Sequence, residues 1–327
     1  MRPGFADARS NLSVALKDLG RLDEAVAACR RTLALNSDFA EAYNNLGTVL
    51  QAQGVLGEAV VAFHQAMALQ PQNPMPPNNL GMAFHEMGRP GDARMAFRHA
   101  LALKLDLAAA HSNLILAMNY DGGVSQGGIL AESRRWDSVD GAPRLSHAVP
   151  DGSDRRLRIG YVSPDFCRHY VGHFIEPIIA NHDRWSFEVY CYAEVATPDD
   201  QTPHFQDLAH AWRPTMGLGD SAVAEQIRHD GIDILVDLAG HTAGNRLGVF
   251  AKLPAPVQLA WISYPNTTGI AAMGYRFTVA VADPPGAADK EHSETLMRLE
   301  HGFLCFAPPG GAPSAPPPRR TSPRRRA

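Results

Sequence analysis

The sequence predicts a fold of two parts: an all-α repeat array in its first third, then an open, parallel α/β lobe. Two observations lead to this prediction. Asparagine–leucine pairs recur at residues 11, 45, 79 and 113, an interval of 34. From Arg156 onward, segments typical of strands alternate with segments typical of helices. We therefore expect a helical solenoid joined to a lobe built on a parallel sheet.

Length and composition fit a soluble protein of about two domains. The chain has 327 residues, 45% of them hydrophobic, and a formal net charge of -4. The charge gives no reason to expect a nucleic-acid partner, and no apolar run approaches the roughly 20 residues that span a membrane. The four cysteines lie far apart and form no CxxC pair. We expect a reduced, cytoplasmic protein without a secretion signal.

The 34-residue period extends well beyond the asparagines. A glycine, an alanine and a leucine recur with the same interval: Gly20, Gly54 and Gly88; Ala25, Ala59 and Ala93; Leu35, Leu69 and Leu103. The glycines stand where a first helix must end, and the alanines where two helices come too close for a larger side chain. This period and pattern predict tetratricopeptide repeats, with two antiparallel helices in each unit. About three and a half units fill residues 1–119.

The repeated asparagines suggest what the array binds. Stacked repeats present a concave groove to peptides, and Asn45, Asn79 and Asn113 would form a ladder along it that binds a peptide backbone. The alternative is that each asparagine caps or bridges helices locally. Three prolines, Pro74, Pro76 and Pro77, are expected to interrupt the third unit where its first helix begins.

A linker is predicted between the two parts. After the first helix of the fourth unit comes the glycine-rich stretch 119–128, then a short helix around residues 129–136 and a polar segment up to residue 154. We expect residues 120–154 to be a linker and residues 155–306 to be the lobe.

Five segments of the lobe are predicted strands and three are predicted helices. The strands are expected at residues 157–163, 187–193, 233–238, 257–263 and 277–282, and the helices at about 173–182, 222–230 and 245–252. The alternation predicts a Rossmann-like, parallel sheet with crossover helices.

Polar and glycine residues gather directly after four of these strands. The clusters are Asp165, His169 and His173; Glu194, Asp199 and Asp200; Gly240, His241 and Thr242; and the loop from Tyr264 through Pro265, Asn266, Thr267 and Thr268 to Gly269. In a parallel sheet these clusters share one edge, where open α/β folds bind ligands. We therefore predict the active site at this edge.

Each cluster also has a simpler explanation. A single histidine at the end of a strand is often only packed or solvated. A spacing of four residues puts His169 and His173 on one helical face if the helix has begun by His169. That pair lacks the third ligand and the neighbouring glutamate of a helical zinc site, so we expect no metal. The GxGxxG, P-loop and GxSxG motifs are absent from the sequence.

Taken together, these residues resemble the O-linked N-acetylglucosamine transferase family, including its bacterial and SPINDLY-like members. After the repeats, four motifs carry the resemblance: Arg158-Ile-Gly-Tyr-Val-Ser-Pro-Asp-Phe with the two histidines, Phe187-Glu-Val-Tyr-Cys-Tyr, Asp230-Gly-Ile-Asp-Ile-Leu-Val-Asp-Leu-Ala-Gly-His-Thr, and Leu253-Pro-Ala-Pro-Val-Gln-Leu-Ala-Trp-Ile-Ser-Tyr-Pro-Asn-Thr-Thr-Gly. They follow one another in the family's order and cover about residues 5–306.

The resemblance implies an activity and the residues that carry it. It implies transfer of N-acetylglucosamine from UDP-GlcNAc to serine or threonine hydroxyls by two Rossmann-like lobes, without a metal or other cofactor, on acceptor proteins recruited by the repeats. His169 would assist deprotonation of the acceptor hydroxyl, with His173 supporting it. The substrate-binding residues would be His241, Thr242, Tyr264, Pro265, Thr267 and Gly269, with Asn45, Asn79 and Asn113 in the groove.

The sequence departs from the family pattern in three ways. Tyr170 follows the first histidine, where the family often has proline. Ser263, Asn266 and Thr268 replace three residues of the family's Gly-Tyr-Pro-Gly-Thr-Ser-Gly loop. The matching sequence stops near residue 306, before the lobe that makes most of the family's contacts to UDP, and residues 307–327 have a Pro/Arg-rich composition typical of disorder. We therefore expect a truncated transferase that is inactive by itself. The alternative is a peptide-binding repeat scaffold with a vestigial lobe.

Overall fold

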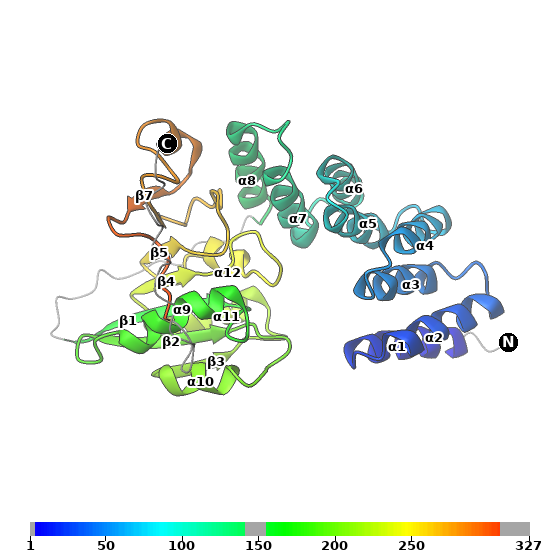
Figure 1. The fold of residues 1–327 in the computed structure, drawn as a ribbon, viewed down its shortest axis with the longest axis horizontal. Helices are drawn as coiled ribbons and strands as arrows, with labels where there is room; N and C mark the ends of the chain where they lie inside the picture. The colour runs from blue at the N-terminus through cyan, green and yellow to red at the C-terminus, as the bar shows by residue number, and fades with distance from the viewer. Residues whose placement is uncertain (1–3, 141–154, 308–327) are drawn as a thin grey trace, which may run out of the picture.

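The computed structural model describes residues 4–140 and 155–307, which form a curved array of helices followed by an α/β lobe (Figure 1). Other residues, including most of the predicted polar linker and the Pro/Arg-rich tail, lie outside the described residues. The helices of the array are α1 (Gly4–Asp18), α2 (Leu22–Leu35), α3 (Ala40–Ala52), α4 (Leu56–Leu69), α5 (Met75–Glu86), α6 (Pro90–Leu103), α7 (Ala108–Asn119) and α8 (Gln126–Asp140).

The period of 34 residues is the period of the helix pairs. The repeated glycines adopt positive φ angles, +72° at Gly20, +77° at Gly54 and +69° at Gly88, where an L-residue would be strained. Each of them lies just after the first helix of its pair. The alanines of the pattern are fully buried between helices. The predicted tetratricopeptide repeats are therefore confirmed.

A second pair of repeated residues fixes how closely the helices pack. A Cβ atom added to Gly47 in α3 would lie 2.5 Å from the ring of Phe63 in α4, and one added to Gly81 would lie 2.5 Å from the ring of Phe97. Both rings are completely buried. The missing side chain in one helix thus makes room for the aromatic ring of the other.

The prolines of the third unit do not interrupt it, so that prediction is wrong. α5 begins at Met75, and Pro76 and Pro77 lie in its first turn. Amide groups in the first turn have no partner within the helix, so proline costs no hydrogen bond there.

The helix after the array is longer than predicted and belongs to the packed structure. α8 covers Gln126–Asp140 rather than residues 129–136, and it packs against α7. Nε1 of Trp136 donates to the carbonyl of Ala108 at 3.4 Å, and Nε2 of His111 lies 2.8 Å from Oε1 of Glu132. The fourth unit therefore has a second helix. The period could not reveal it because the glycine-rich stretch interrupts the repeat.

The lobe contains one seven-stranded sheet whose neighbouring strands all run parallel, in the order β3-β2-β1-β4-β5-β6-β7. The strands are β1 (Leu157–Ser163), β2 (Phe187–Ala193), β3 (Ala211–Pro214), β4 (Ile234–Asp237), β5 (Val257–Ala260), β6 (Tyr275–Thr278) and β7 (Thr295–Arg298). The helices are α9 (Tyr170–Asn181), α10 (Thr202–Leu208), α11 (Asp220–His229), α12 (Leu247–Ala251) and α13 (Ala287–Glu291). This confirms the predicted Rossmann-like fold.

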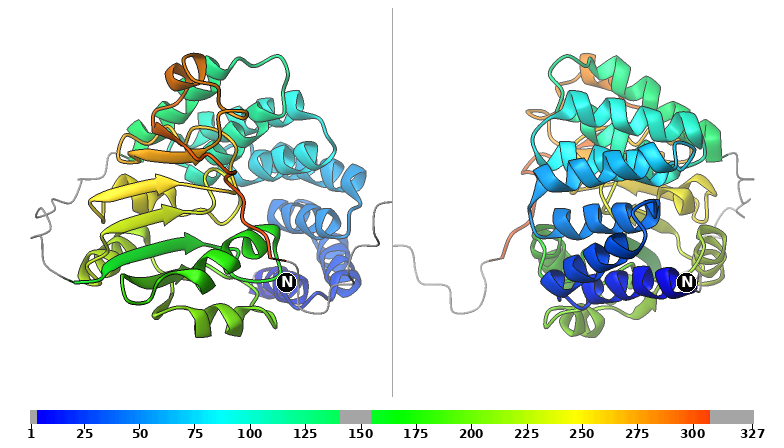
Figure 2. Two further views of the ribbon diagram at one scale, coloured as in Figure 1. Left: turned by 60° about the vertical axis from the view of Figure 1, so that its left-hand side comes forward. Right: turned by 90° about the vertical axis from the view of Figure 1, so that its right-hand side faces the viewer.

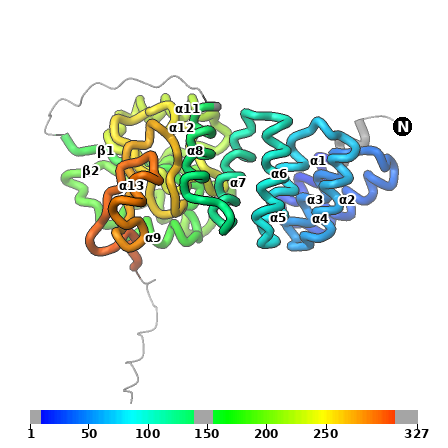
Figure 3. Tube along the Cα trace, turned by 90° about the horizontal axis from the view of Figure 1, so that it is seen from above, coloured from blue at the N-terminus to red at the C-terminus, as the bar shows by residue number. Residues whose placement is uncertain are grey.

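Helices cover both faces of the sheet (Figures 1 and 3). The apolar face of α9 packs with Ile159 and Tyr161 of β1 in one core cluster. The apolar face of α11 packs on the other side, in a cluster that contains Tyr192 and also residues of α7 and α8. Alternate residues of each strand therefore serve different cores, as the two-residue period of a strand requires.

The repeats meet the lobe at one end only. α7 and α8 lie against the lobe, whereas α1 and α2 lie at the far end of the array, as the views from the front and from above agree (Figures 1 and 3). The left view of Figure 2 shows strands of the sheet side by side, and the right view shows the stacked helices of the array. No helix in the described ranges combines the length and the apolar character needed to cross a membrane.

Candidate active site

Two of the loops that carry predicted residues lie at the point where the chain order of the sheet reverses. β1 lies between β2 and β4, so the connections that leave β1 and β4 run to opposite sides. The loops after these two strands lie at the carboxyl edge of the sheet, where open α/β proteins bind ligands. His169 lies in the first of these loops and Thr242 in the second.

His169 is the N-cap of α9 rather than a residue inside the helix. Its backbone is extended (φ −141°, ψ 155°), and its Nδ1 accepts a hydrogen bond from the backbone amide of Val171 at 3.4 Å. His173, by contrast, lies in the first turn, where its side chain is exposed and its amide donates to the carbonyl of His169 at 3.1 Å. The two histidines therefore do not share a helical face through regular spacing, because the helix has not yet begun at His169.

A carboxylate lies beside the ring of His169. Oδ1 of Asp165 is 3.3 Å from Nδ1 of His169, and the Asp165 side chain is mostly buried. Burial raises the pKa of Asp165, and the charge of a protonated His169 opposes that shift. Without a proton, Nδ1 accepts from Val171; when the ring instead carries its proton on Nδ1, the carboxylate of Asp165 is the acceptor beside it and Nε2 keeps a free lone pair. This is the arrangement of a base that is oriented by an acid.

Three hydroxyl groups adjoin this pair. The ring of Tyr170 packs on that of His169, with 4.1 Å between ring centroids, and the Tyr170 hydroxyl lies 3.5 Å from Oγ of Ser263. Oγ of Ser263 is in turn 3.4 Å from Oγ1 of Thr242. Both distances are at the long end of the hydrogen-bond range. Tyr170 is 52% exposed, so this row of hydroxyls borders solvent.

The loop after β5 is mostly buried, in contrast to the expectation that it faces the acceptor. Pro265 is exposed, but Tyr264, Thr267 and Gly269 are buried. Asn119 of α7 donates to the Tyr264 hydroxyl at 2.8 Å, and Glu294 accepts from Oγ1 of Thr267 at 2.6 Å. A Cβ atom on Gly269 (φ +74°) would lie 2.3 Å from the Cβ of Ser133 in α8. These buried residues hold the loop in place through their contacts with α7, α8 and Glu294.

His241 is also buried and joins the two domains. Its Nδ1 lies 3.2 Å from Oγ of Ser112 in α7, and its Nε2 lies 2.9 Å from the carbonyl of Thr268. The side chain has no exposed surface. Burial lowers the pKa of His241 to about 4, so the ring is neutral at physiological pH. In this structure it connects the array to the lobe and offers no surface to a substrate.

The asparagines of the repeats bridge neighbouring units. Nδ2 of Asn45 donates to Oγ of Ser10 at 2.7 Å, that of Asn79 to Oδ1 of Asn44 at 3.0 Å, and that of Asn113 to Oδ1 of Asn78 at 3.3 Å. These are the contacts expected from local bridging. Asn79 and Asn113 remain partly exposed, so both can still meet a peptide in the groove.

Two charged groups were not predicted as site residues. Glu294 accepts hydrogen bonds from Thr267 and from the backbone amide of Thr268, the latter at 2.6 Å, and so holds the loop after β5. Arg246 pairs with Glu194 at 2.7 Å and with Asp220 at 2.9 Å behind the loop after β4. Glu194 belonged to a predicted cluster, but no spacing in the sequence links Glu194 to Arg246. No spacing links Glu294 to the loop after β5 either. Within the described part of the chain, no three His, Cys, Asp or Glu side chains are placed to hold a metal ion.

Both parts of the chain are similar to known protein families. Residues 143–306 match the family described as glycosyl transferase family 41, and residues 14–54 and 39–70 match tetratricopeptide-repeat families. A solved structure described as a mutant of Thermobaculum terrenum O-GlcNAc transferase is similar over 97% of this chain and 62% of that chain, with a TM-score of 0.88 and 34% identity.

Two curated relatives match about two thirds and just under half of this chain. The tomato (Solanum lycopersicum) protein described as a probable UDP-N-acetylglucosamine–peptide N-acetylglucosaminyltransferase SPINDLY is 41% identical over 221 residues, which are 65% of this chain and 24% of the relative. A UDP-N-acetylglucosamine–peptide N-acetylglucosaminyltransferase of Caenorhabditis elegans is 39% identical over 158 residues, 46% of this chain and 13% of the relative. The chain thus spans about a quarter, or less, of the length of these two relatives.

Proposed function

The chain belongs to glycosyl transferase family 41, and from this membership and the geometry at the sheet edge we propose that it binds and activates the acceptor in protein O-GlcNAc transfer. The donor is UDP-GlcNAc and the acceptor is a serine or threonine hydroxyl of a protein. The relatives named above support the choice of sugar and acceptor. No further cofactor is part of the proposal.

One observation carries the chemistry: His169 lies at the switch point with its Nδ1 beside Asp165. Nε2 of His169 takes the proton of the acceptor hydroxyl as that oxygen forms a bond to the anomeric carbon of the sugar. The bond from that carbon to the UDP oxygen breaks, and UDP leaves with the electron pair. A positioned general base contributes about 10²- to 10⁴-fold to such a rate.

Three neighbouring hydroxyl groups, those of Tyr170, Ser263 and Thr242, are available to contact the acceptor. Tyr170, Ser263 and Thr242 border the open side of His169, where hydroxyl groups can donate to or accept from a peptide. His173 and Pro265 are exposed beside them. The buried residues of the loop after β5 keep this border in place rather than touching the substrate.

The repeats recruit the acceptor protein. Tetratricopeptide arrays bind peptides in their concave groove, and Asn79 and Asn113 are partly exposed. The packed junction through α7 and α8 then directs a bound peptide toward the lobe. All four cysteines are free thiols, which supports a reducing compartment such as the cytoplasm.

A segment exchange tests this proposal. In T. terrenum O-GlcNAc transferase, the part that superposes on this chain is replaced by residues 1–306 of this chain, and transfer from UDP-GlcNAc to a serine-containing peptide is measured. We expect transfer that depends on His169. A folded chimera that binds peptides but transfers no sugar would contradict the proposal. It would favour the alternative, a peptide-binding repeat scaffold, for which the confirmed repeats are the supporting observation.

A further inference from the structure

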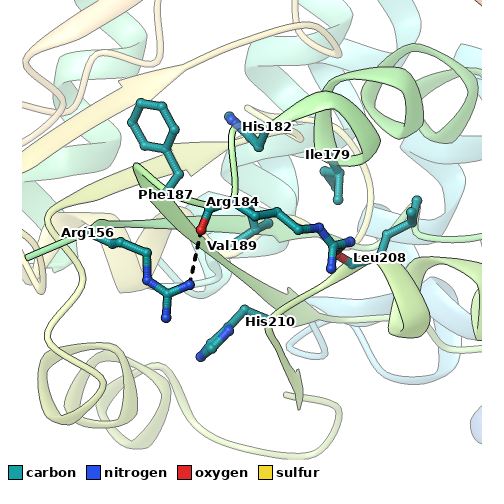
Figure 4. A pocket seen from close by; sticks show the side chains of 8 residues that line it. All are labelled: Arg156, Ile179, His182, Arg184, Phe187, Val189, Leu208 and His210. Atoms are coloured by element: carbon teal, nitrogen blue, oxygen red, sulfur yellow. Dashed lines mark hydrogen bonds between the residues drawn. The ribbon is translucent and has the colours of Figure 1, made fainter.

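A cavity lies at the edge of the sheet opposite to the edge that carries His169. It has a volume of about 110 Å³ and is lined by Arg156, Ile179, His182, Arg184, Phe187, Val189, Leu208 and His210 (Figure 4). Phe187 is the first residue of β2 and pairs with the first residue of β1, so the cavity opens at the amino edge. The seven residues of β1 separate the two edges by roughly 20 Å, at about 3.3 Å per residue.

The lining is basic around an apolar floor. Two arginines and two histidines contribute to it, and no aspartate or glutamate does. Ile179, Phe187, Val189 and Leu208 supply the apolar surface. A ligand that fits must therefore offer acceptors to the basic side chains and carry a part that tolerates contact with hydrocarbon.

One nearby carboxylate neutralises only part of this charge. Both oxygens of Glu188 are already occupied: Oε1 accepts from Arg156 at 2.6 Å and Oε2 accepts from Arg158 at 3.0 Å. Burial acts to raise the pKa of Glu188, but the hydrogen bond from Arg158 and the charges of Arg156 and His210 lower it overall. The Glu188 carboxylate is therefore ionised and paired with Arg156 and Arg158.

Arg184 is the uncompensated cation of this cavity. Its Nη2 donates to the carbonyl of Leu208 at 3.3 Å. Across residues 4–140 and 155–307, no carboxylate lies within ion-pair distance of its guanidinium group. The four other N–H hydrogens of that group remain for a ligand or for water.

The other basic groups approach from different elements. His182 is the C-cap of α9; its Nε2 lies 2.7 Å from the Tyr161 hydroxyl, and burial lowers the pKa of its ring. His210 precedes β3, and Arg156 precedes β1 and donates to the carbonyl of Arg184 at 3.1 Å. Figure 4 shows that these side chains come from separate segments of the chain.

We propose that this cavity binds a small phosphate monoester, with the phosphate held by Arg184 and its basic neighbours and the organic part resting on Phe187 and Leu208. A tetrahedral oxyanion offers acceptors in several directions, which suits donors that come from separate segments, and arginine pairs with phosphate through two parallel bonds. Roughly 10–15 Å³ suffices for one water molecule, so the volume admits a phosphate with a few attached atoms.

Calorimetric titration of the 327-residue chain with inorganic phosphate and with phenyl phosphate tests the site at constant ionic strength. We expect saturable binding of phosphate with a Kd of about 1 mM or tighter, and severalfold tighter binding of phenyl phosphate because its ring covers the apolar floor. Arg184→Gln should weaken both at least tenfold. Arg184 is exposed and holds no ion pair, so this variant keeps the fold.

Arg228→Gln is the matched control, because Arg228 is an exposed arginine on α11 that pairs with Glu225 instead of lining the cavity. It should leave both Kd values unchanged. A second readout is the rise of the melting temperature with phosphate, expected in the wild type and in Arg228→Gln but not in Arg184→Gln. Absence of saturable binding up to about 20 mM, equal affinity in Arg184→Gln, or equal loss in both variants would each overturn the proposal.

Discussion

Nδ1 of His241 lies 3.2 Å from Oγ of Ser112, and this contact continues a series that runs through the repeats. Ser10, Asn44, Asn78 and Ser112 occupy one repeat position, at intervals of 34. The first three accept a hydrogen bond from an asparagine of the following unit. At Ser112 the partner is a histidine of the lobe. The lobe therefore docks on the array as the next repeat would.

This docking makes stability depend on pH through His241. Burial holds its pKa at about 4 in the folded protein, below the usual 6.5. As pH falls from 6.5 to 4, the unfolded chain gains a proton that the folded chain does not, so the fold loses up to about 3 kcal/mol. His241→Gln removes this loss. The stability advantage of the wild type over the variant should therefore shrink by about that amount between pH 7 and pH 4, as measured by urea unfolding.

The comparison isolates His241 from other titrating groups. Burial raises the pKa of Asp237 to about 6, which stabilises the fold as pH falls from 6 toward 3.8, the opposite direction. Asp237 is present in both proteins and cancels in the difference. A wild-type advantage that stays constant with pH would show that His241 is protonated equally in both states.

Close helix packing in the array gives a second prediction. Gly47→Ala places a methyl group against the ring of Phe63 and should destabilise the fold by about 1–3 kcal/mol, because a packed core does not yield. Gly57→Ala, in the next helix, meets open space and should leave stability unchanged or raise it by less than about 1 kcal/mol. Thermal unfolding of both variants checks this. Equal melting temperatures would mean that the Phe63 ring can move aside.

Sequence periodicity predicted most of the fold because burial is periodic. β1 and β2 have the predicted bounds, since the last five residues of each strand form a continuous buried run. β3 and β7 were not predicted. Each has only four residues, one of them an arginine, and so shows neither a polar–apolar alternation nor an apolar run. The last predicted strand, at residues 277–282, is β6 at Tyr275–Thr278, because the chain turns at Val279, whose carbonyl accepts from Asp283 at 3.0 Å.

The family departure at Tyr170 gives a third prediction. Tyr170 is the first residue of α9, where proline is well tolerated, and His169 already has the extended backbone that a following proline requires. Tyr170→Pro should therefore keep the melting temperature within about 2 °C. It also removes the ring that packs on His169, so modification of His169 by diethyl pyrocarbonate should become faster.

The two measurements on Tyr170→Pro address different claims. A large loss of stability would contradict the helix start at this residue. An unchanged or slower modification rate would contradict the role of the tyrosine ring as a cover over the imidazole.

Asp165 gives a fourth prediction. With its carboxylate 3.3 Å from Nδ1 of His169, the neutral ring should carry its proton on Nδ1, and nitrogen-15 shifts should identify Nε2 as the bare nitrogen. Asp165→Asn weakens this preference and should lower kcat of the chimera at least about tenfold with little change in KM. Asp200→Asn, which alters only an exposed pair with Arg168, is the control. A proton on Nε2 in the wild type would exclude His169 as the base.

The sequence predicted at which edge of the sheet the site residues lie, but not which of their side chains are exposed. The carboxyl edge follows from strand order, so the sequence placed His169, Thr242 and Pro265 there correctly. It also placed His241, Tyr264 and Thr267 there, but these side chains turn inward to α7 and to Glu294. Their partners lie 129, 145 and 27 residues away in the chain. No local pattern records contacts of that kind.

The dependence of sugar transfer on His169 tests the central claim most directly. In the chimera that carries residues 1–306, the initial rate of transfer from UDP-GlcNAc to a serine peptide is measured for the unchanged segment, for His169→Ala and for His173→Ala. We predict a fall of about 10²-fold or more for His169→Ala, and a rate within a few-fold of the unchanged segment for the exposed His173→Ala. Transfer by His169→Ala at the unchanged rate would contradict the account.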